Sequence, residues 1–408
     1  MYPTIYHAVK DLFGVEIPFL KILQSFGFFV AISFLLAGYF FSHELKRKER
    51  LGLVKSTFRK VMKGEAASSS DLITNGIFGF LIGYKLIGFL WNYGSITGNP
   101  RDYMLSLQGN VIGGLLLAAV FAWMKYREKE KLRLPEPKLM DVPFHPYEHV
   151  SNMTLIAAVA GLLGAKLFHI LENLGDFRAD PMGMVFSFSG LTMYGGLIVG
   201  GLSVIYYAHR NGMDIRYVID ACAPGLMLAY GVGRIGCHVA GDGDWGIPHT
   251  AAKPGWFVLP DWMWAYNYPN NVNQECNPYI QGTLERAGCH CNWNETPYLI
   301  AKVFPTPFYE SVICIALFFV LWAFRKRIRI PGMMFSIYLI MNGIERFFIE
   351  QIRENTVLFK IHDYTVTQAM FIAICLFLLG LTGIFYFSRL ASRELPVPAP
   401  PPEPPAAA

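Results

Sequence analysis

Two arginines at predicted membrane depth are the residues of this sequence best suited to chemistry. Arg234 lies in a Gly-Val-Gly-Arg-Ile-Gly segment near the end of one apolar run, and Arg346 lies near the end of another. A guanidinium group at membrane depth is costly, so it usually faces a cavity and serves a function. Two such groups predict a site for an anion, and the abundant anion of a membrane is a lipid phosphate.

The residues that follow Arg234 offer it partners. Glycines around an arginine leave room for a bidentate partner such as phosphate. Asp242 and Asp244 either orient the guanidinium group or bind a polar headgroup, and an internal ion pair between Arg234 and an acid is the alternative. His238 is a candidate general base, with a hydrogen-bonded structural histidine as the other interpretation.

The second arginine belongs to a charged stripe. Arg346, Glu350 and Arg353 recur at spacings of four and three residues, which places them on one face of a helix. Asn342 lies one turn earlier on the same face. We expect this face to point into the protein as a substrate-binding surface, and an ion-pair network between helices is the alternative.

Two further stretches complete the candidate site. Tyr309 and Glu310 follow a proline-rich turn, and Glu310 near membrane depth requires a partner such as arginine, unless it only caps the helix that begins there. Tyr194, Gly195 and Gly196 lie in a glycine-rich segment. Such glycines allow close helix packing, or they free backbone amides to bind an anion.

Composition indicates how these residues are positioned. Of the 408 residues, 53% are hydrophobic and only 16% are charged, well below the roughly 25% charge of soluble domains. The sequence therefore predicts an all-α, polytopic membrane helix bundle. Nine apolar stretches have the length that crosses a bilayer, near residues 20–41, 72–92, 107–125, 151–171, 193–209, 217–239, 308–324, 332–350 and 367–388.

Basic clusters follow alternate spans. They comprise Lys46, Arg47, Lys48, Arg50, Arg59 and Lys60; Lys125, Arg127, Lys129, Lys131 and Arg133; Arg210 and Arg216; Arg325, Lys326, Arg327 and Arg329; and Arg389 and Arg393. Because basic loops stay in the cytoplasm, this pattern places the N-terminus outside and the C-terminus inside. No cleavable signal peptide is evident, so the first span is expected to remain as an anchor.

The predicted organisation has five parts. They are an outer N-terminal segment (1–19), the first span with a basic cytoplasmic loop (20–70), an inserted two-helix hairpin with a cytoplasmic linker (71–150), a catalytic membrane core (151–390) and a disordered Pro/Ala tail (391–408). The core includes a long outer loop, 241–307, rich in the aromatic residues that favour a membrane interface. We expect this loop to cap the outer leaflet.

The cysteines indicate structure rather than metal binding. Cys222, Cys237, Cys314 and Cys375 lie in apolar spans, where a small buried hydrophobe is expected. In the outer loop, an oxidising compartment favours a disulfide from Cys276 to Cys289 or Cys291. No metal or organic cofactor and no nucleic acid is expected.

A short internal similarity links the inserted hairpin to the core. The segment 81–92 resembles 162–173, sharing a Gly-x-Lys-Leu spacing around Lys85 and Lys166. Similar helix packing through small residues explains such a match, and so does chance.

Together, these motifs resemble those of the prolipoprotein diacylglyceryl transferase family of bacterial inner membranes. The family has a Gly-Gly-Leu-Ile stretch, a Gly-Arg-Ile-Gly signature, a Pro-x-x-x-Tyr-Glu stretch and a late Arg-x-x-x-Glu-x-x-Arg helix, and all occur here in that order. Leu163-Gly-Ala-Lys-Leu167 also resembles the family's Gly-Ala-Arg-Leu segment. The resemblance covers most of residues 20–40 and 150–388.

The sequence departs from the family at several positions. Tyr194 stands where the family has a histidine proposed as the base, and Cys237 stands where it has an asparagine. Phe304-Pro-Thr-Pro307 replaces a His-Pro-x-Gln stretch, and Phe26-Gly27 replaces Tyr-Gly. The family core has seven spans, so the hairpin at about 71–126 is an insertion of two, which preserves the sidedness of everything after it.

The resemblance implies transfer of a diacylglyceryl group from phosphatidylglycerol to the lipobox cysteine of a preprolipoprotein signal peptide, the first step of bacterial lipoprotein maturation. It implies a multi-pass inner-membrane enzyme with its active site toward the outer leaflet, in contact with membrane lipids. Arg234 and Arg346 would stabilise phosphate charge, while Tyr194, His238 or the arginine field alone would activate the thiol. A secondary transporter or a lipid-binding membrane protein for an anionic substrate is the alternative.

Overall fold

The computed structural model describes residues 1–91, 103, 106–135, 137–187, 190, 192–273, 302–353, 357–361 and 364–394. The described chain is mostly helical and divides into two compact units. One contains Met1, Phe26–Lys55 and Pro146–Ala408, and the other contains Tyr2–Ser25 and Ser56–His145. Each unit is considered separately below.

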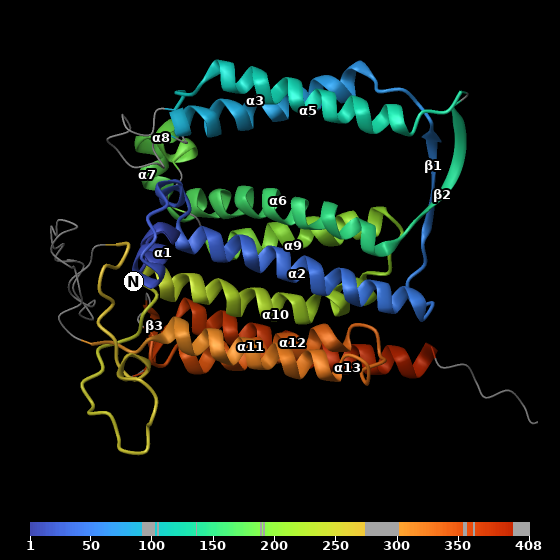
Figure 1. Cartoon of the computed structure of the whole chain (residues 1–408). Coiled ribbons are helices and arrows are strands. Elements are labelled where there is room, and N and C mark those ends of the chain that lie inside the picture. Colours follow the sequence, from blue (N-terminus) through green and yellow to red (C-terminus); the bar gives the residue numbers. More distant parts are fainter. Residues whose placement is uncertain are drawn as a thin grey trace, which may run out of the picture. The chain divides into compact units, whose positions relative to one another are not determined.

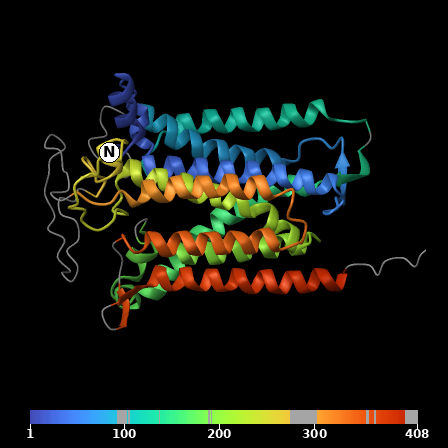
Figure 2. The same cartoon turned by 90° about the horizontal axis from the view of Figure 1, so that it is seen from below.

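The larger unit is a bundle of long helices that run along a common direction (Figures 1 and 2). Its elements are α2 (Ser25–Arg50), η3 (Pro146–Glu148), α6 (His149–Glu172), α7 (Leu174–Ala179), α8 (Pro181–Phe186), α9 (Met193–Arg210), α10 (Ile215–Ala240), η4 (Asp261–Met263), α11 (Thr306–Phe324), α12 (Met333–Ile349), β3 (Val357–Ile361), β4 (Tyr364–Thr367) and α13 (Gln368–Glu394). In this unit α6 pairs with α9, α12 with α13, and α10 with α11 and α12.

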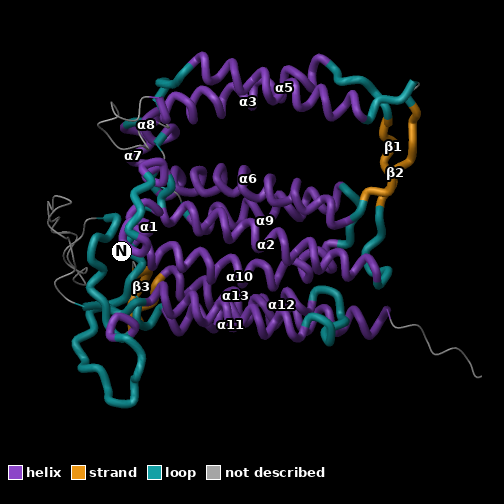
Figure 3. The backbone as a smooth tube through the Cα atoms, viewed as in Figure 1, coloured by secondary structure: helices purple, strands orange, loops and turns teal. Residues whose placement is uncertain are grey.

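The smaller unit carries the inserted hairpin. It contains α1 (Ile5–Phe13), η1 (Pro18–Ile22), β1 (Thr57–Lys63), α3 (Ser69–Trp91), α5 (Val111–Lys131) and β2 (Lys138–Phe144). Helices α3 and α5 pack closely against each other. Strands β1 and β2 form an antiparallel ribbon that pairs Thr57 with Phe144 and Lys63 with Lys138 (Figure 3).

The strands correct the all-α prediction. Besides the β1–β2 ribbon, β3 and β4 form a second two-stranded antiparallel sheet just before α13. Arg59 and Lys60, predicted in a basic loop, lie in β1. Both sheets lie in connections between long helices, so the core remains helical.

Several predicted boundaries also shift. The first long helix begins at Ser25 rather than near residue 20 and continues to Arg50, so the basic cluster that starts at Lys46 is helical. The N-terminal segment folds into α1 and η1. Helix α13 continues to Glu394, past the predicted start of the tail at 391, and the residues that follow lie outside the described chain.

Six of the described helices are long and apolar enough to cross a membrane, which makes the chain a polytopic membrane protein. They are Ser25–Arg50, Ser69–Trp91, Pro146–Glu172, Ile215–Ala240, Thr306–Phe324 and Gln368–Ser392. The other three predicted spans correspond to α5, α9 and α12. Helix α12 has only 17 residues, and the last turns of α5 are charged.

Helix α10 lies at the centre of the larger unit. Of its apolar window, 61% is buried inside the protein, against 11–33% for the other five candidates. Met227 and Val232 of α10 pack with Cys314 and Phe318 of α11 in the main apolar cluster. A residue near the end of α10, such as Arg234, is therefore surrounded by protein rather than by lipid.

A buried carboxylate fixes α12 against α10. Asp220 of α10 is 4% exposed and accepts hydrogen bonds from the backbone amides of Gly332 (2.8 Å) and Phe335 (2.9 Å) at the start of α12. Lys48 of α2 approaches the same carboxylate at 3.8 Å. This cap sets the depth of α12 and hence the position of Arg346 at its other end.

Candidate active site

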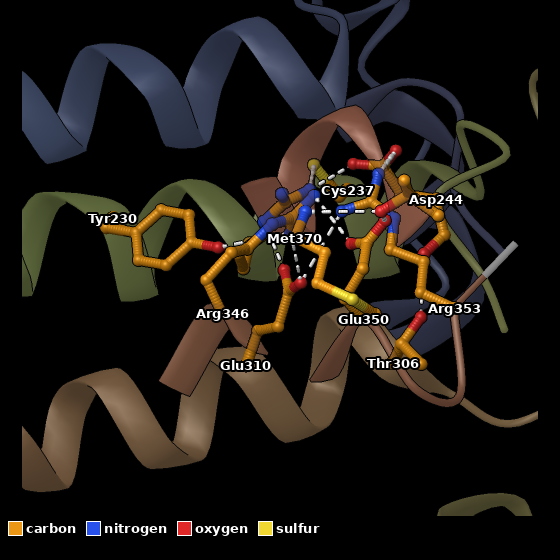
Figure 4. Close-up of polar contacts among 11 residues, drawn as sticks. Tyr230, Cys237, Asp244, Thr306, Glu310, Arg346, Glu350, Arg353 and Met370 are labelled. Carbon is orange, nitrogen blue, oxygen red and sulfur yellow. Dashed lines mark hydrogen bonds and ion pairs between the residues drawn. The ribbon is translucent and has the colours of Figure 1, made fainter. Parts of the chain in front are cut away.

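The two predicted arginines meet on one carboxylate, and Figure 4 shows that carboxylate, Glu310, beside Arg346. The Glu310 side chain, from the second turn of α11, is 1% exposed. One of its oxygens pairs with Nε of Arg234, and the other accepts a hydrogen bond of 2.8 Å from Nη1 of Arg346. Guanidinium groups separated by more than 100 residues of sequence thus share a buried acid.

A second carboxylate joins the cluster from outside the helices. Asp244, in the turn after α10, pairs through one oxygen with Nη1 of Arg234 and through the other with Nη2 of Arg353. Nη1 of Arg353 also lies 3.4 Å from Glu310. The hydroxyl of Thr306 donates a 2.7 Å hydrogen bond to the backbone carbonyl of Asp244, which holds the turn in place.

The charged stripe predicted from spacing converges on this cluster. Nη2 of Arg346 lies 3.3 Å from Glu350, four residues later. Glu350 is also held from the end of β4, just before α13, because the Thr367 hydroxyl donates a 2.7 Å hydrogen bond to it. Asn342, one turn before Arg346, is half-buried on the same helix.

Three guanidinium groups therefore face three carboxylates in a largely dry region. The side chains of Arg234 and Arg353 are each 8% exposed, Arg346 is 14% exposed and Glu350 is fully buried. This arrangement is compatible with both interpretations of Arg234, as a group that binds an anionic substrate and as a partner in an internal ion pair. The ion pairs themselves hold the guanidinium groups close together around Glu310. Removing one partner of a buried pair typically costs about 3–5 kcal/mol.

Tyr230 and Thr367 are cluster residues that the sequence analysis did not select. The Tyr230 ring lies 5.3 Å from the Arg234 guanidinium carbon, and its hydroxyl lies 3.5 Å from Nη1 of Arg346. Tyr230 precedes Arg234 by four residues on α10, so helical spacing offered a signal for it. The sequence offered no such signal for Thr367, because its hydrogen bond to Glu350 depends on how α13 packs beside α12.

The side chains of Cys237, Asp242 and Asp244 have ligand atoms that all lie within 4.8 Å of one another, a grouping that some metal sites share. Arg234 already contributes a cation there, because its Nη1 pairs with Asp244 and lies 3.7 Å from the Cys237 sulfur. We therefore interpret the three as part of the ion-pair cluster.

Asp242 and Asp244 have opposite electrostatic environments. Burial and the neighbouring Asp244 carboxylate raise the pKa of Asp242. Burial also opposes ionisation of Asp244, but the guanidinium groups of Arg234 and Arg353 outweigh it and lower the pKa of that carboxyl. Asp244 is thus a permanent anion of the cluster, whereas Asp242 is ionised at a cost to the folded state.

This difference predicts opposite effects on stability. A carboxyl with a raised pKa in the folded protein stabilises the fold at low pH and loses that contribution as pH rises. Asp242→Asn should therefore raise Tm at pH 7 and change it little below about pH 4. Asp244→Asn should lower Tm at pH 7. Thermal unfolding in detergent measures both, and a destabilised Asp242→Asn variant at pH 7 would contradict the assignment.

His238 lies in an aromatic cluster beside the outer loop. Its Nδ1 is 3.2 Å from the hydroxyl of Tyr268, and its ring centroid lies 5.5 Å from Trp262 and 5.7 Å from Phe308. These contacts are typical of a structural histidine, and a base role for His238 stays a prediction. Tyr309 also supports the loop, since its hydroxyl donates a 2.7 Å hydrogen bond to the carbonyl of Met263.

Tyr194, Gly195 and Gly196 form the first turns of α9. The half-buried Tyr194 phenol interacts electrostatically with Arg346, Glu350 and Arg353, which places it near the cluster. Gly195 packs tightly on α6, because a Cβ there would lie 2.5 Å from the Gly164 carbonyl oxygen. The glycines thus provide close helix packing, and their role toward a substrate stays a prediction.

Some predictions fall outside the described residues. Cys276, Cys289 and Cys291, with the proposed disulfide among them, belong to the undescribed range 274–301. The part of the outer loop that is described packs Trp245, Tyr268 and Val303 into a small buried cluster.

Fold and site together define a polytopic membrane protein with a buried, arginine-rich cluster between its helices. A family model described as prolipoprotein diacylglyceryl transferase matches residues 136–386. The chain belongs to this family. The match begins after the inserted hairpin and includes every residue of the cluster.

Individual relatives agree with this assignment. A phosphatidylglycerol--prolipoprotein diacylglyceryl transferase of Clostridium tetani is 27% identical over 207 residues, which cover 50% of this chain and 69% of the relative. One from Enterococcus faecalis is 26% identical over 265 residues, covering 64% of this chain and 78% of the relative.

Proposed function

We propose that this chain transfers the diacylglyceryl group of phosphatidylglycerol to a prolipoprotein, and that the cluster around Glu310 is where the reaction occurs. The enzyme class follows from membership of the family. The observation that supports the location is the convergence of Arg234, Arg346 and Arg353 on one buried carboxylate.

The reaction requires what these side chains supply. A bond forms between the lipobox sulfur and a glyceryl carbon, the bond from that carbon to a phosphate oxygen breaks, and glycerol phosphate leaves with the electron pair. Negative charge grows on the phosphate as it leaves. Guanidinium groups fixed beforehand stabilise this charge without reorganisation, an effect worth several kcal/mol in a dry site.

The carboxylates keep the guanidinium groups in place before the lipid arrives. With three positive and three negative side chains, the cluster is close to neutral, so it is tolerated at membrane depth. A phosphodiester can replace Glu310 or Asp244 on a guanidinium group by forming the same bidentate hydrogen bonds. Asp244 suits this exchange, because its side chain is 29% exposed whereas that of Glu310 is 1% exposed.

Thiol activation is tested by two substitutions. Tyr194→Phe should lower kcat at least tenfold if the ionised form of Tyr194 accepts the thiol proton, since general-base catalysis typically contributes 10²–10⁴-fold. His238→Gln should then have little effect, because His238 lies among aromatic rings. Initial rates against pH measure both variants. Full activity in both variants would indicate that the positive charge of the nearby arginines alone activates the thiol.

The substrates require access from the side of the bundle, because a two-tailed lipid and a peptide on a signal helix cannot leave the bilayer. The nine predicted spans, with the N-terminus outside, would place the cluster toward the outer leaflet of a bacterial inner membrane. The outer loop carries apolar residues suited to that surface, with Trp256 75% and Val258 89% exposed.

A direct assay tests the function. Purified protein, phosphatidylglycerol and a lipobox peptide should give a peptide that gains the mass of a diacylglyceryl group. No gain under conditions where a known transferase works would overturn the proposal. Transport of the same lipid without chemistry would instead favour the transporter alternative, which predicts repeated halves that both carry the arginine motifs.

A further inference from the structure

The elements of the inserted hairpin, formed by α3 and α5, recur 81 or 82 residues later in the hairpin formed by α6 and α9, which we call the core hairpin. Strand β2 begins 81 residues after β1 and ends 81 residues after it, and α6 ends 81 residues after α3. Helix α9 begins 82 residues after α5. Each strand therefore precedes a helix, a connection and a second helix in the same order and spacing.

Equivalent lysines make equivalent contacts inside the two hairpins. Lys166 of α6 donates hydrogen bonds to the carbonyl (2.8 Å) and hydroxyl (2.9 Å) oxygens of Ser187. Lys85 of α3 donates to the carbonyl oxygen of Ser106, and also to that of Gln108 at 2.9 Å. In both hairpins the serine follows its lysine by 21 residues.

The backbone contacts repeat as well. The amide of Thr192, just before α9, donates to the Ala165 carbonyl at 3.1 Å, and the amide of Asn110, just before α5, donates to the Tyr84 carbonyl at 2.9 Å. The two donors lie 82 residues apart in the sequence, and the two acceptors lie 81 residues apart.

The glycine contacts follow the same pattern. A Cβ on Gly164 would meet the carbonyl oxygen of Gly195, and one on Gly83 would meet that of Gly113. Three pairs of equivalent contacts at an offset of 81 or 82 residues, added to the matching Gly-x-Lys-Leu segments, argue against chance as the explanation of the internal similarity.

The two hairpins differ where the chemistry would occur. Tyr194, in the first turn of α9, faces the charged cluster. The equivalent position in α5 is Ile112, which is 71% exposed. The inserted hairpin thus keeps the contacts of its lysine but has an isoleucine at the position equivalent to Tyr194.

We propose that residues 57–131 are a second copy of 138–210, and that Lys166 is a positioning residue for the reaction, acting through Tyr194. This inference rests on the proposed function. A lysine within a membrane helix is costly unless its ammonium group is satisfied. Here it ties the end of the α7–α8 connection to α6, which fixes where α9 starts and how Tyr194 meets the arginines. Lys85 performs the same task in a copy without a reactive residue.

The duplicated lysine contacts supply their own control. Lys166→Met should lower kcat at least about tenfold, since small misplacements of reacting groups are expensive, while KM for phosphatidylglycerol changes less than about twofold. Lys166→Arg, the residue of the related family segment, should restore most of kcat. Lys85→Met should lower Tm by a similar amount and leave kcat unchanged. Ser187→Ala removes only the hydroxyl that accepts a hydrogen bond from Lys166, and it replaces Lys166→Met as the test if that variant fails to fold.

Defined outcomes overturn the inference. Wild-type kcat in a folded Lys166→Met protein would refute it, as would an equal loss of kcat in Lys85→Met. Loss in Lys166→Met with full activity in Tyr194→Phe would exclude the route through Tyr194. An inactive wild-type protein, or an active Arg234→Gln variant, would instead count against the proposed function itself.

Discussion

Arg234→Gln is expected to lower kcat/KM for phosphatidylglycerol by at least about 100-fold, the effect typical of removing one preorganised charge contact. Arg234 pairs with both Glu310 and Asp244, the two carboxylates that Arg353 also contacts. Glutamine keeps a hydrogen-bond donor but no charge. Initial rates of peptide modification at several lipid concentrations measure the effect.

A matched variant separates catalysis from folding. Arg325, at the far end of α11, is also buried, at 13% exposed, and its Nε lies 3.4 Å from the carboxylate of Glu44. It lies 15 residues after Glu310, about 22 Å along the helix. Arg325→Gln should therefore lower Tm but retain kcat/KM within about threefold. Similar rate losses in the two variants would show that Arg234 only stabilises the fold.

Much of the cluster could be predicted, because a charged residue within an apolar run long enough to cross a membrane is a strong signal of a functional site. Arg234 and Arg346 stood out as costly residues in apolar runs, and Glu310 was expected to need an arginine. The spacing of Arg346, Glu350 and Arg353 predicted one helical face, but α12 ends at Ile349, so Arg353 reaches the cluster from the turn after the helix. What sequence could not supply was which acid would bridge the two arginines, since this depends on the packing of α10, α11 and α12.

The β ribbon and the internal copy were harder to predict. In β1, the charges of Arg59, Lys60 and Lys63 obscure any alternation of apolar residues, and the partner strand lies 81 residues later. The copy shares few identical residues, because a helix hairpin tolerates most apolar exchanges. The equivalence of the shared residues became evident from the contacts of Lys85 and Lys166 and from the repeated backbone and glycine contacts.

Glu310→Gln provides the complementary test of the cluster, from its acidic side. We expect kcat to fall about 100-fold, because Arg234, Arg346 and Arg353 lose their common acceptor and repel one another. The cluster then carries one more positive charge, so an anionic lipid should bind at least as well and KM should not rise. Steady-state kinetics separates the two effects.

The control for this variant is another buried carboxylate that pairs with arginines but has no role in the reaction. Glu44 of α2 is 2% exposed and pairs with Arg47, at 2.9 Å, and with Arg325 of the α11 C-terminus, at 3.4 Å. Glu44→Gln should therefore destabilise the protein as Glu310→Gln does while leaving kcat near the wild-type value. A raised KM in Glu310→Gln would indicate that Glu310 contacts the substrate rather than holding the guanidinium groups in place. An unchanged kcat would mean that Asp244 and Glu350 suffice to orient the arginines.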